Sequence, residues 1–154
     1  MVNLNKKLII EQLDKKLQKY SIFEETDIPS KGWIYSIRTA LNMSLTQLGR
    51  RIKKTAQSVR EIELREQEKS LTIKKFIEVA EALNLRFVYG FVLRDSSLEK
   101  MIENRALQIA EEIVMRTSHT MALEDQKNSD ERLMKAIKDR AELIKQEIPK
   151  ILWD

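Results

Sequence analysis

The fold of this chain is decided by residues 44–65, SLTQLGRRIKKTAQSVREIELR. Ser44 can cap a first helix and Thr55 a second, because each side chain can accept a backbone N–H of its own first turn. Apolar residues recur at helical spacing in both segments: Leu45, Leu48, Ile52, Val59 and Ile62. Gly49 and Ala56 are small enough for two helices to approach closely. Two short helices with a tight turn between them predict a helix-turn-helix.

Positive charge is concentrated around this motif. Residues 31–75 hold eleven Lys or Arg and four Glu, a net charge of +7, whereas the whole chain carries +4 and the remainder therefore −3. A basic helical module favours nucleic-acid binding, because each cation that neutralises a phosphate releases counterions. A solvated surface of mixed charge is the alternative. The coincidence of the charge with the motif favours DNA.

The second helix of such a motif enters the major groove and presents its first turns to the base edges. Gln57 can bond adenine through two hydrogen bonds, and Arg60 can reach guanine or the backbone. The residues predicted to read bases are Gln57, Ser58, Arg60 and Glu61. Those predicted to contact the DNA backbone are Arg38, Gln47, Arg50, Lys53, Lys54 and Thr55.

The rest of the composition predicts a mainly α-helical protein, because the chain has 3 Gly, 2 Pro and 42% hydrophobic residues. Apolar periodicity predicts further helices, at residues 3–20, 31–42 and 71–84, then from a cap at 96 or 97, and at 128–147. Ile28 precedes Pro29, which disfavours helical backbone at position 28 and predicts a linker before the motif. We therefore expect an N-terminal helical arm with its linker (1–29), a DNA-binding domain (30–95) and a C-terminal helical region (96–154).

One stretch has a different texture. Residues 85–93, LRFVYGFVL, are rich in aromatic and β-branched residues and predict a short β-strand. No second strand is evident, so the strand predicts antiparallel pairing of residues 86–93 with a second copy in a homodimer. The alternative is that this run is the buried end of the preceding helix.

The sequence offers little for catalysis. It has no cysteine, one histidine and three scattered glycines, so we expect no enzyme, metal or cofactor. A hydrolase with an unrecognised site is a distant alternative. The charged N-terminus has no signal-peptide core and no later stretch has the length of a membrane span, so we expect a cytoplasmic protein.

The segment MSLTQLGRRIKKTAQSVREIE (43–63) resembles the lambda-repressor-like (Xre) helix-turn-helix family. The resemblance implies a lambda-repressor-like bundle that binds double-stranded operator DNA. Two positions depart from the family pattern. Leu45 stands where Gln is usual at the start of the first helix, and Lys53 stands where Gly is usual in the turn, which asks a lysine for an unusual backbone conformation.

The flanking segments resemble the mobile mystery protein A family, a set of small helix-turn-helix proteins associated with mobile elements. The resemblance is carried by NKKLIIEQLDKKL (5–17), KGWI (31–34), SHTMALEDQ (118–126) and ILWD (151–154). It implies a neighbouring Fic-domain protein, and hence an antitoxin that represses its own operon. An antitoxin that binds only protein, with a vestigial helix-turn-helix, is the alternative.

Many Fic enzymes, which transfer AMP, are inhibited by a helix of the pattern [Ser/Thr]-x-x-x-Glu-[Gly/Asn]. Residues 120–125, TMALED, come close to this pattern, although Asp125 departs from it. Thr120 and Glu124 lie one helical turn apart, so the carboxylate could engage a phosphate-binding arginine of the partner. The alternative is that this segment is a structural join between helices.

Overall fold

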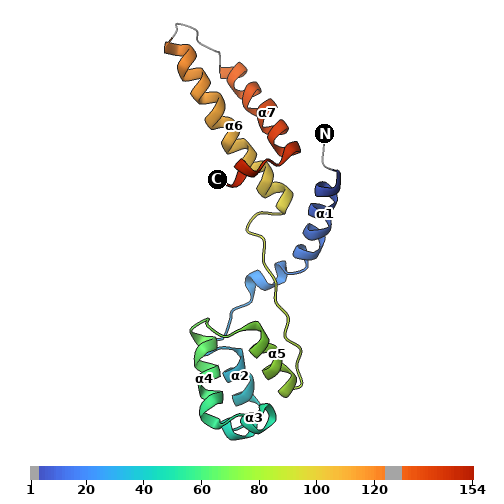
Figure 1. The fold of residues 1–154 in the computed structure, drawn as a ribbon, viewed down its shortest axis with the longest axis vertical. Helices are drawn as coiled ribbons and strands as arrows, with labels where there is room; N and C mark the ends of the chain where they lie inside the picture. Colours follow the sequence, from blue (N-terminus) through green and yellow to red (C-terminus); the bar gives the residue numbers. More distant parts are fainter. Residues whose placement is uncertain (1–3, 124–129) are drawn as a thin grey trace. The chain divides into compact units, whose positions relative to one another are not determined.

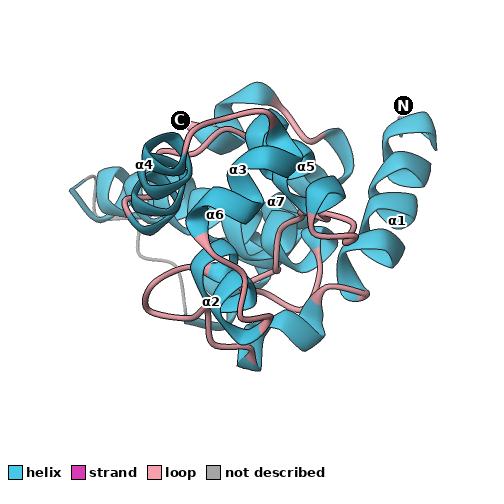
Figure 2. Cartoon of the chain, turned by 90° about the horizontal axis from the view of Figure 1, so that it is seen from below, coloured by secondary structure: helices cyan, strands magenta, loops and turns pink. Residues whose placement is uncertain are grey.

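The computed structural model describes residues 4–123 and 130–154, which divide into two compact units. Unit 2 is residues 25–90, and unit 1 combines residues 1–24 with residues 91–154. The described residues form helices and loops (Figures 1 and 2). The prediction of a mainly helical fold is therefore confirmed. No described helix has the length and hydropathy that a membrane crossing requires.

Unit 2 is a bundle of four helices with one core. Its helices are α2 (Trp33–Ala40), α3 (Leu45–Ile52), α4 (Ala56–Gln67) and α5 (Ile73–Ala82). The buried core residues are Ile34, Leu48, Ile52, Val59, Ile62, Val79 and Leu83. Four of the five apolar positions expected in the motif are thus buried, and Leu45 packs at the edge of the same core.

Unit 1 is built on the long antiparallel pair α6 (Leu98–Leu123) and α7 (Asp130–Glu147). It also contains α1 (Leu4–Gln18) and two short 3₁₀ helices, η1 (Ser21–Glu25) and η2 (Lys150–Trp153). The buried core residues are Ile102, Ala106, Ile109, Ala110, Ala141, Ile144 and Leu152. Alanines at three of these positions let the two long helices approach closely.

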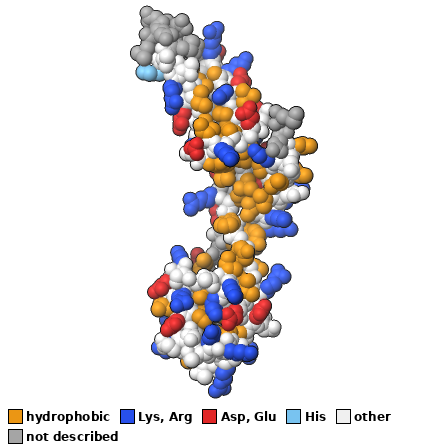
Figure 3. Space-filling view, in the orientation of Figure 1, with side chains coloured by type: hydrophobic (Ala, Val, Ile, Leu, Met, Phe, Trp, Pro, Cys, Tyr) orange, Lys and Arg blue, Asp and Glu red, His pale blue; other side chains and the backbone are white. Residues whose placement is uncertain are grey.

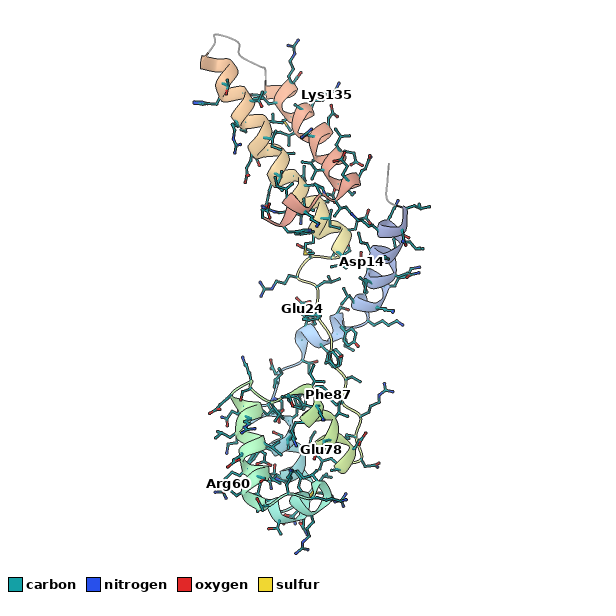
Figure 4. All side chains as sticks on the ribbon, viewed as in Figure 1. Asp14, Glu24, Arg60, Glu78, Phe87 and Lys135 are labelled. Atoms are coloured by element: carbon teal, nitrogen blue, oxygen red, sulfur yellow. The ribbon has the colours of Figure 1, made fainter. Side chains whose placement is uncertain are left out.

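The N-terminal helix α1 docks on the start of α6 within unit 1 (Figure 4). Asp14 is 8% exposed, and its Oδ1 accepts a hydrogen bond from Leu98 N at 2.6 Å. Its Oδ2 accepts a longer one from Glu99 N at 3.4 Å. A carboxylate at a helix N-terminus satisfies free N–H groups and complements the helix dipole. α1 therefore supplies part of the cap of α6, together with Ser97, whose Oγ accepts from Lys100 N.

The β-strand predicted over residues 85–93 is wrong, because the described chain contains no strand. The run is not the end of the preceding helix either, since α5 stops at Ala82 and Asn84 has a φ of 57°. Its aromatic rings stack instead: Phe87 lies on Phe76 of α5 with 4.6 Å between ring centroids, and Tyr89 follows Phe87 at 6.2 Å. A strand needs a backbone partner as well as β-prone residues, and none lies beside this run in the described chain.

Candidate nucleic-acid interface

Both helices of the motif begin at the residues that the sequence indicates. Ser44 Oγ accepts from Gln47 N at 3.1 Å, and Gln47 Oε1 accepts from Ser44 N at 2.8 Å, which completes a capping box. Thr55 Oγ1 accepts from Ser58 N at 3.1 Å at the start of α4. These local bonds fix where α3 and α4 start, and the start of α4 sets where the turn between them ends.

The turn between α3 and α4 is tight because Gly49 and Lys53 both adopt demanding positions. A Cβ on Gly49 would stand 2.5 Å from the carbonyl oxygen of Lys54, a distance that no real side chain tolerates. Lys54 N donates to the Gly49 carbonyl at 2.8 Å. Lys53 has φ 56° and ψ 44°, the left-handed conformation that the sequence required of it. The close approach of α3 and α4 thus depends on the missing side chain of Gly49.

The inner side of α4 is attached to α2 by two buried carboxylates. Glu66 Oε1 and Oε2 accept from Trp33 N at 2.7 Å and Ile34 N at 2.9 Å, so this side chain caps α2. Glu63 accepts from Arg38 Nε at 2.5 Å and Nη2 at 3.2 Å. Both carboxylates are nearly inaccessible, with 8% of Glu63 and 9% of Glu66 exposed. α4 is therefore held in one orientation by bonds that depend on direction as well as by apolar packing.

The packing of Glu66 also explains Gly32, the residue before α2. Gly32 has φ 86°, and a Cβ there would stand 2.8 Å from the Glu66 side chain. Only glycine meets both requirements at this position.

The outer side of α4 carries the polar side chains that the sequence predicts to read bases. Gln57, Arg60 and Glu61 are exposed, and Arg60 projects outward from the helix (Figure 4). Ser58 is half-buried, and its Oγ lies 2.9 Å from Thr55 Oγ1, so its hydroxyl already has a partner at the helix start. The four residues lie on the first two turns of one helix, which is the part that a major groove admits.

Most residues predicted to contact the DNA backbone are exposed beside α4. They are Gln47, Arg50, Lys53, Lys54 and Thr55. The capping box uses only the side-chain oxygen of Gln47, which leaves its amide nitrogen for a phosphate. Lys and Arg side chains lie over the surface of unit 2 in Figure 3.

Arg38 differs from the other predicted backbone contacts because it is 8% exposed. Its Nη1 donates to the Met43 carbonyl at 2.8 Å, and its other two nitrogens donate to Glu63. All three nitrogens of the guanidinium thus have partners inside unit 2, and we leave Arg38 out of the interface.

The charge around the motif also acts on a neighbouring carboxylate. Lys75 Nζ donates to Glu78 Oε2 at 2.7 Å, and this hydrogen bond lowers the pKa of Glu78. The positive charges of Lys75, Lys54 and Lys74 lower it further. The carboxylate is therefore held ionised by its hydrogen bond to Lys75 and by the positive charges of the α3–α4 turn and α5.

Sequence reasoning missed the roles of Glu63 and Glu66. A signal existed, because residues 59, 62, 63 and 66 share one face of the predicted helix, and the first two of these residues, Val59 and Ile62, are apolar. Two acids on such an inward face indicate buried carboxylates with specific partners.

The predicted partner-inhibiting pair is only half described. Thr120 is exposed near the end of α6, and its Oγ1 donates to the Arg116 carbonyl at 3.1 Å. Glu124 lies outside the described residues.

A comparison with known proteins supports the assignment of this domain as a helix-turn-helix. A helix-turn-helix family model matches residues 34–89, which is unit 2 almost from end to end. Residues 34–89 are therefore a helix-turn-helix domain of the kind found in DNA-binding transcriptional regulators. The match leaves α1, α6 and α7 outside it. No curated protein and no solved structure matches the chain.

Proposed function

We propose that this protein is a sequence-specific DNA-binding regulator that recognises the operator of its own operon. The single observation that carries the proposal is the division of α4 into two sides. Glu63 and Glu66 anchor the inner side on α2, and Gln57, Arg60 and Glu61 stand exposed on the outer side. A helix that is fixed from behind and polar in front can present donors and acceptors to base edges with little loss of conformational entropy.

Exposed residues of α3 and of the turn position the helix on the duplex in this proposal. Arg50, Lys53 and Lys54 contact phosphates, and the side chains of Thr55 and Gln47 donate hydrogen bonds to the DNA backbone. Such contacts supply affinity without reading sequence, so they make binding steeply dependent on salt.

The test is footprinting and titration on the DNA upstream of its own gene. Gln57→Ala is expected to cost about 1–3 kcal/mol of binding to the operator and little on random DNA, because a bidentate contact is lost. Gln67→Ala is the matched control, since Gln67 is the same exposed residue type at the far end of α4. Lys54→Ala should weaken binding to all sequences and make the salt dependence shallower. An equal loss on both DNAs for Gln57→Ala would contradict base reading.

The proposal includes a homodimer, because two copies present two recognition helices to a two-fold operator. The pairing predicted for residues 86–93 is not part of this proposal, because they form no strand in the described chain.

The antitoxin role and the Fic-domain partner rest on the resemblance of the flanking segments alone. They predict that the co-expressed neighbour is inhibited through Glu124. Glu124→Gly should then restore adenylylation by that partner, while Asp125→Gly leaves it inhibited. Inhibition that survives Glu124→Gly rejects the contact, and tight partner binding without DNA binding favours the protein-only antitoxin.

A further inference from the structure

A small cavity in unit 1 is lined by residues of α1, α6 and α7. Its volume is about 260 Å³, and every residue that lines it belongs to this unit. The lining residues are Lys7, Ile10, Glu11, Glu99, Ile102, Glu142, Lys145, Gln146 and Ile148. A concave site that combines apolar side chains with a few polar groups is the usual form of a small-molecule binding site. The helix-turn-helix domain contributes nothing to this cavity.

Three isoleucines make the apolar part of the cavity. Ile102 is 6% exposed, and Ile10 and Ile148 pack against the same buried core. A liquid allots about 30 Å³ to a water-sized group, so the cavity has room for roughly ten non-hydrogen atoms. A compact branched or aromatic group fits this room, and it is favoured there because it removes isoleucine surface from water.

The first turns of α1 bring an unpaired positive charge and an unpaired negative charge to the cavity. Lys7 and Glu11 both line it, and they lie one helical turn apart, a spacing at which such side chains commonly pair. Yet neither side chain makes an ion pair or a hydrogen bond with any residue that the structure describes. An ammonium and a carboxylate on one face of α1 are therefore free to meet a ligand of both charges.

The other charged residues of the cavity already have neighbours. Lys145 Nζ lies 3.7 Å from Glu99 Oε1, and Glu142 Oε1 accepts from Gln146 Nε2 at 3.2 Å. Two Lys and three Glu give the lining a net charge of −1, which disfavours an occupant that carries only a negative charge. An occupant that carries only a positive charge leaves Lys7 beside a like charge. A zwitterion avoids both costs.

We propose that this cavity binds a free α-amino acid with an apolar side chain. The ligand side chain lies on the three isoleucines, its carboxylate accepts from Lys7 Nζ, and its ammonium donates to the Glu11 carboxylate. The ligand bridges α1 to α6 and α7, because all three helices line the cavity. The inference goes beyond the proposed DNA binding. It is tested without DNA, so its failure is separate from a failure of that function.

The experiment is isothermal titration calorimetry of the full chain with L-leucine and L-phenylalanine. Saturable binding is expected, with a Kd between about 10 μM and 1 mM for a ligand of this size. Three analogues of leucine each lack one recognised part: 4-methylpentanoate has no ammonium, 3-methylbutylamine has no carboxylate, and glycine has no apolar side chain. Each should bind at least about tenfold more weakly. Absence of binding by both amino acids below about 10 mM, or an analogue that binds as tightly as leucine, overturns the proposal.

Two charge variants assign the contacts. Lys7→Gln should weaken leucine binding about tenfold without weakening 3-methylbutylamine, which has no carboxylate to lose a partner. Glu11→Gln should weaken leucine to a similar extent without weakening 4-methylpentanoate. Lys6→Gln is the control, because Lys6 is exposed on the same helix and does not line the cavity. Lys7 and Glu11 are exposed, so the helical circular dichroism should not change. Leucine binding that ignores both variants, or that Lys6→Gln weakens equally, overturns the proposal.

Hydrogen exchange in the wild type locates the ligand independently. The amides of Leu98 and Glu99 donate to Asp14 when α1 is docked on α6. Leucine at ten times its Kd should slow their exchange about tenfold, because the ligand binds only when α1 is in place. The amides of α4 should be unaffected. An amino acid that binds without slowing exchange at Leu98 binds elsewhere and overturns the proposal.

Discussion

In unit 2, two carboxylates of α4 accept hydrogen bonds from α2 and hold the two helices together. In unit 1, alanines allow the two long helices to pack closely against each other. Hydrogen bonds to a carboxylate fix the angle and register between two helices, because they are lost when either helix rotates. Alanine contacts allow close packing but leave the larger side chains of the same helices at the surface. Unit 2 therefore holds α4 in one orientation, as a recognition helix requires, while unit 1 leaves large apolar side chains of its long helices exposed.

The largest effect is expected when the buried ion pair of unit 2, Arg38 with Glu63, is broken. Glu63→Ala leaves the Arg38 guanidinium buried without its carboxylate, at an expected cost of about 3–5 kcal/mol in the free energy of unfolding of unit 2. Because the two units need not unfold together, residue-level hydrogen exchange is the measurement. Amides of α2 to α5 should lose protection and those of α6 should keep it. Glu61→Ala, on the exposed side of α4, is the control and should change little.

The corresponding change in unit 1 is Asp14→Ala. It removes the acceptor for Leu98 N and Glu99 N, and a lost cap of this kind costs about 1–2 kcal/mol. Faster exchange at these two amides, with unit 2 unaffected, is the expected result. Glu11→Ala, on the same helix but exposed, should leave both amides protected. Equal exchange in the two variants would mean that α1 is held by its apolar contacts alone.

Lys53→Gly separates stability from binding within unit 2. Glycine has no steric cost at φ 56°, so the variant should stabilise unit 2 by about 1 kcal/mol. The same change removes a cation from the interface and should weaken DNA binding at low salt. Lys54→Gly is the control, because Lys54 has no positive φ and its replacement should bring no gain in stability. A variant with unchanged DNA affinity would remove Lys53 from the interface.

The smallest expected effect is a dependence of stability on pH, which one carboxylate in each unit contributes. Lys75 lowers the pKa of Glu78 in unit 2, and Lys100 lowers the pKa of Glu103 in unit 1, each through a hydrogen bond. A pKa that is lower in the folded state adds stability above the ordinary carboxyl pKa, and this stability is lost as the pH falls through the lowered value. Glu78→Gln should cost about 0.2–0.5 kcal/mol at neutral pH and nothing in strong acid. NMR titration of both carboxyl groups checks the direction, and an unshifted Glu78 contradicts it.

Local signals were sufficient for the helices of the motif. Ser44 and Thr55 cap α3 and α4 as predicted, and the left-handed Lys53 follows from the position of the turn. The prediction for residues 85–93 was wrong because β-propensity reports side chains, whereas a strand also needs a backbone partner, and none lies beside this run in the described chain. Arg38 misled for a similar reason, since a cation in a basic segment gives no sign of the carboxylate that buries it.

By itself the sequence determined the helical composition, the position of the helix-turn-helix and the exposed face of α4, because these depend on neighbours within a few residues. Only the tertiary structure decided that Glu63 and Glu66 hold α4 on α2, that Asp14 caps a helix 84 residues away, and that Phe87 stacks on Phe76 of α5. These contacts join residues far apart in the chain. Their partners are therefore fixed by how the helices pack and not by any local pattern.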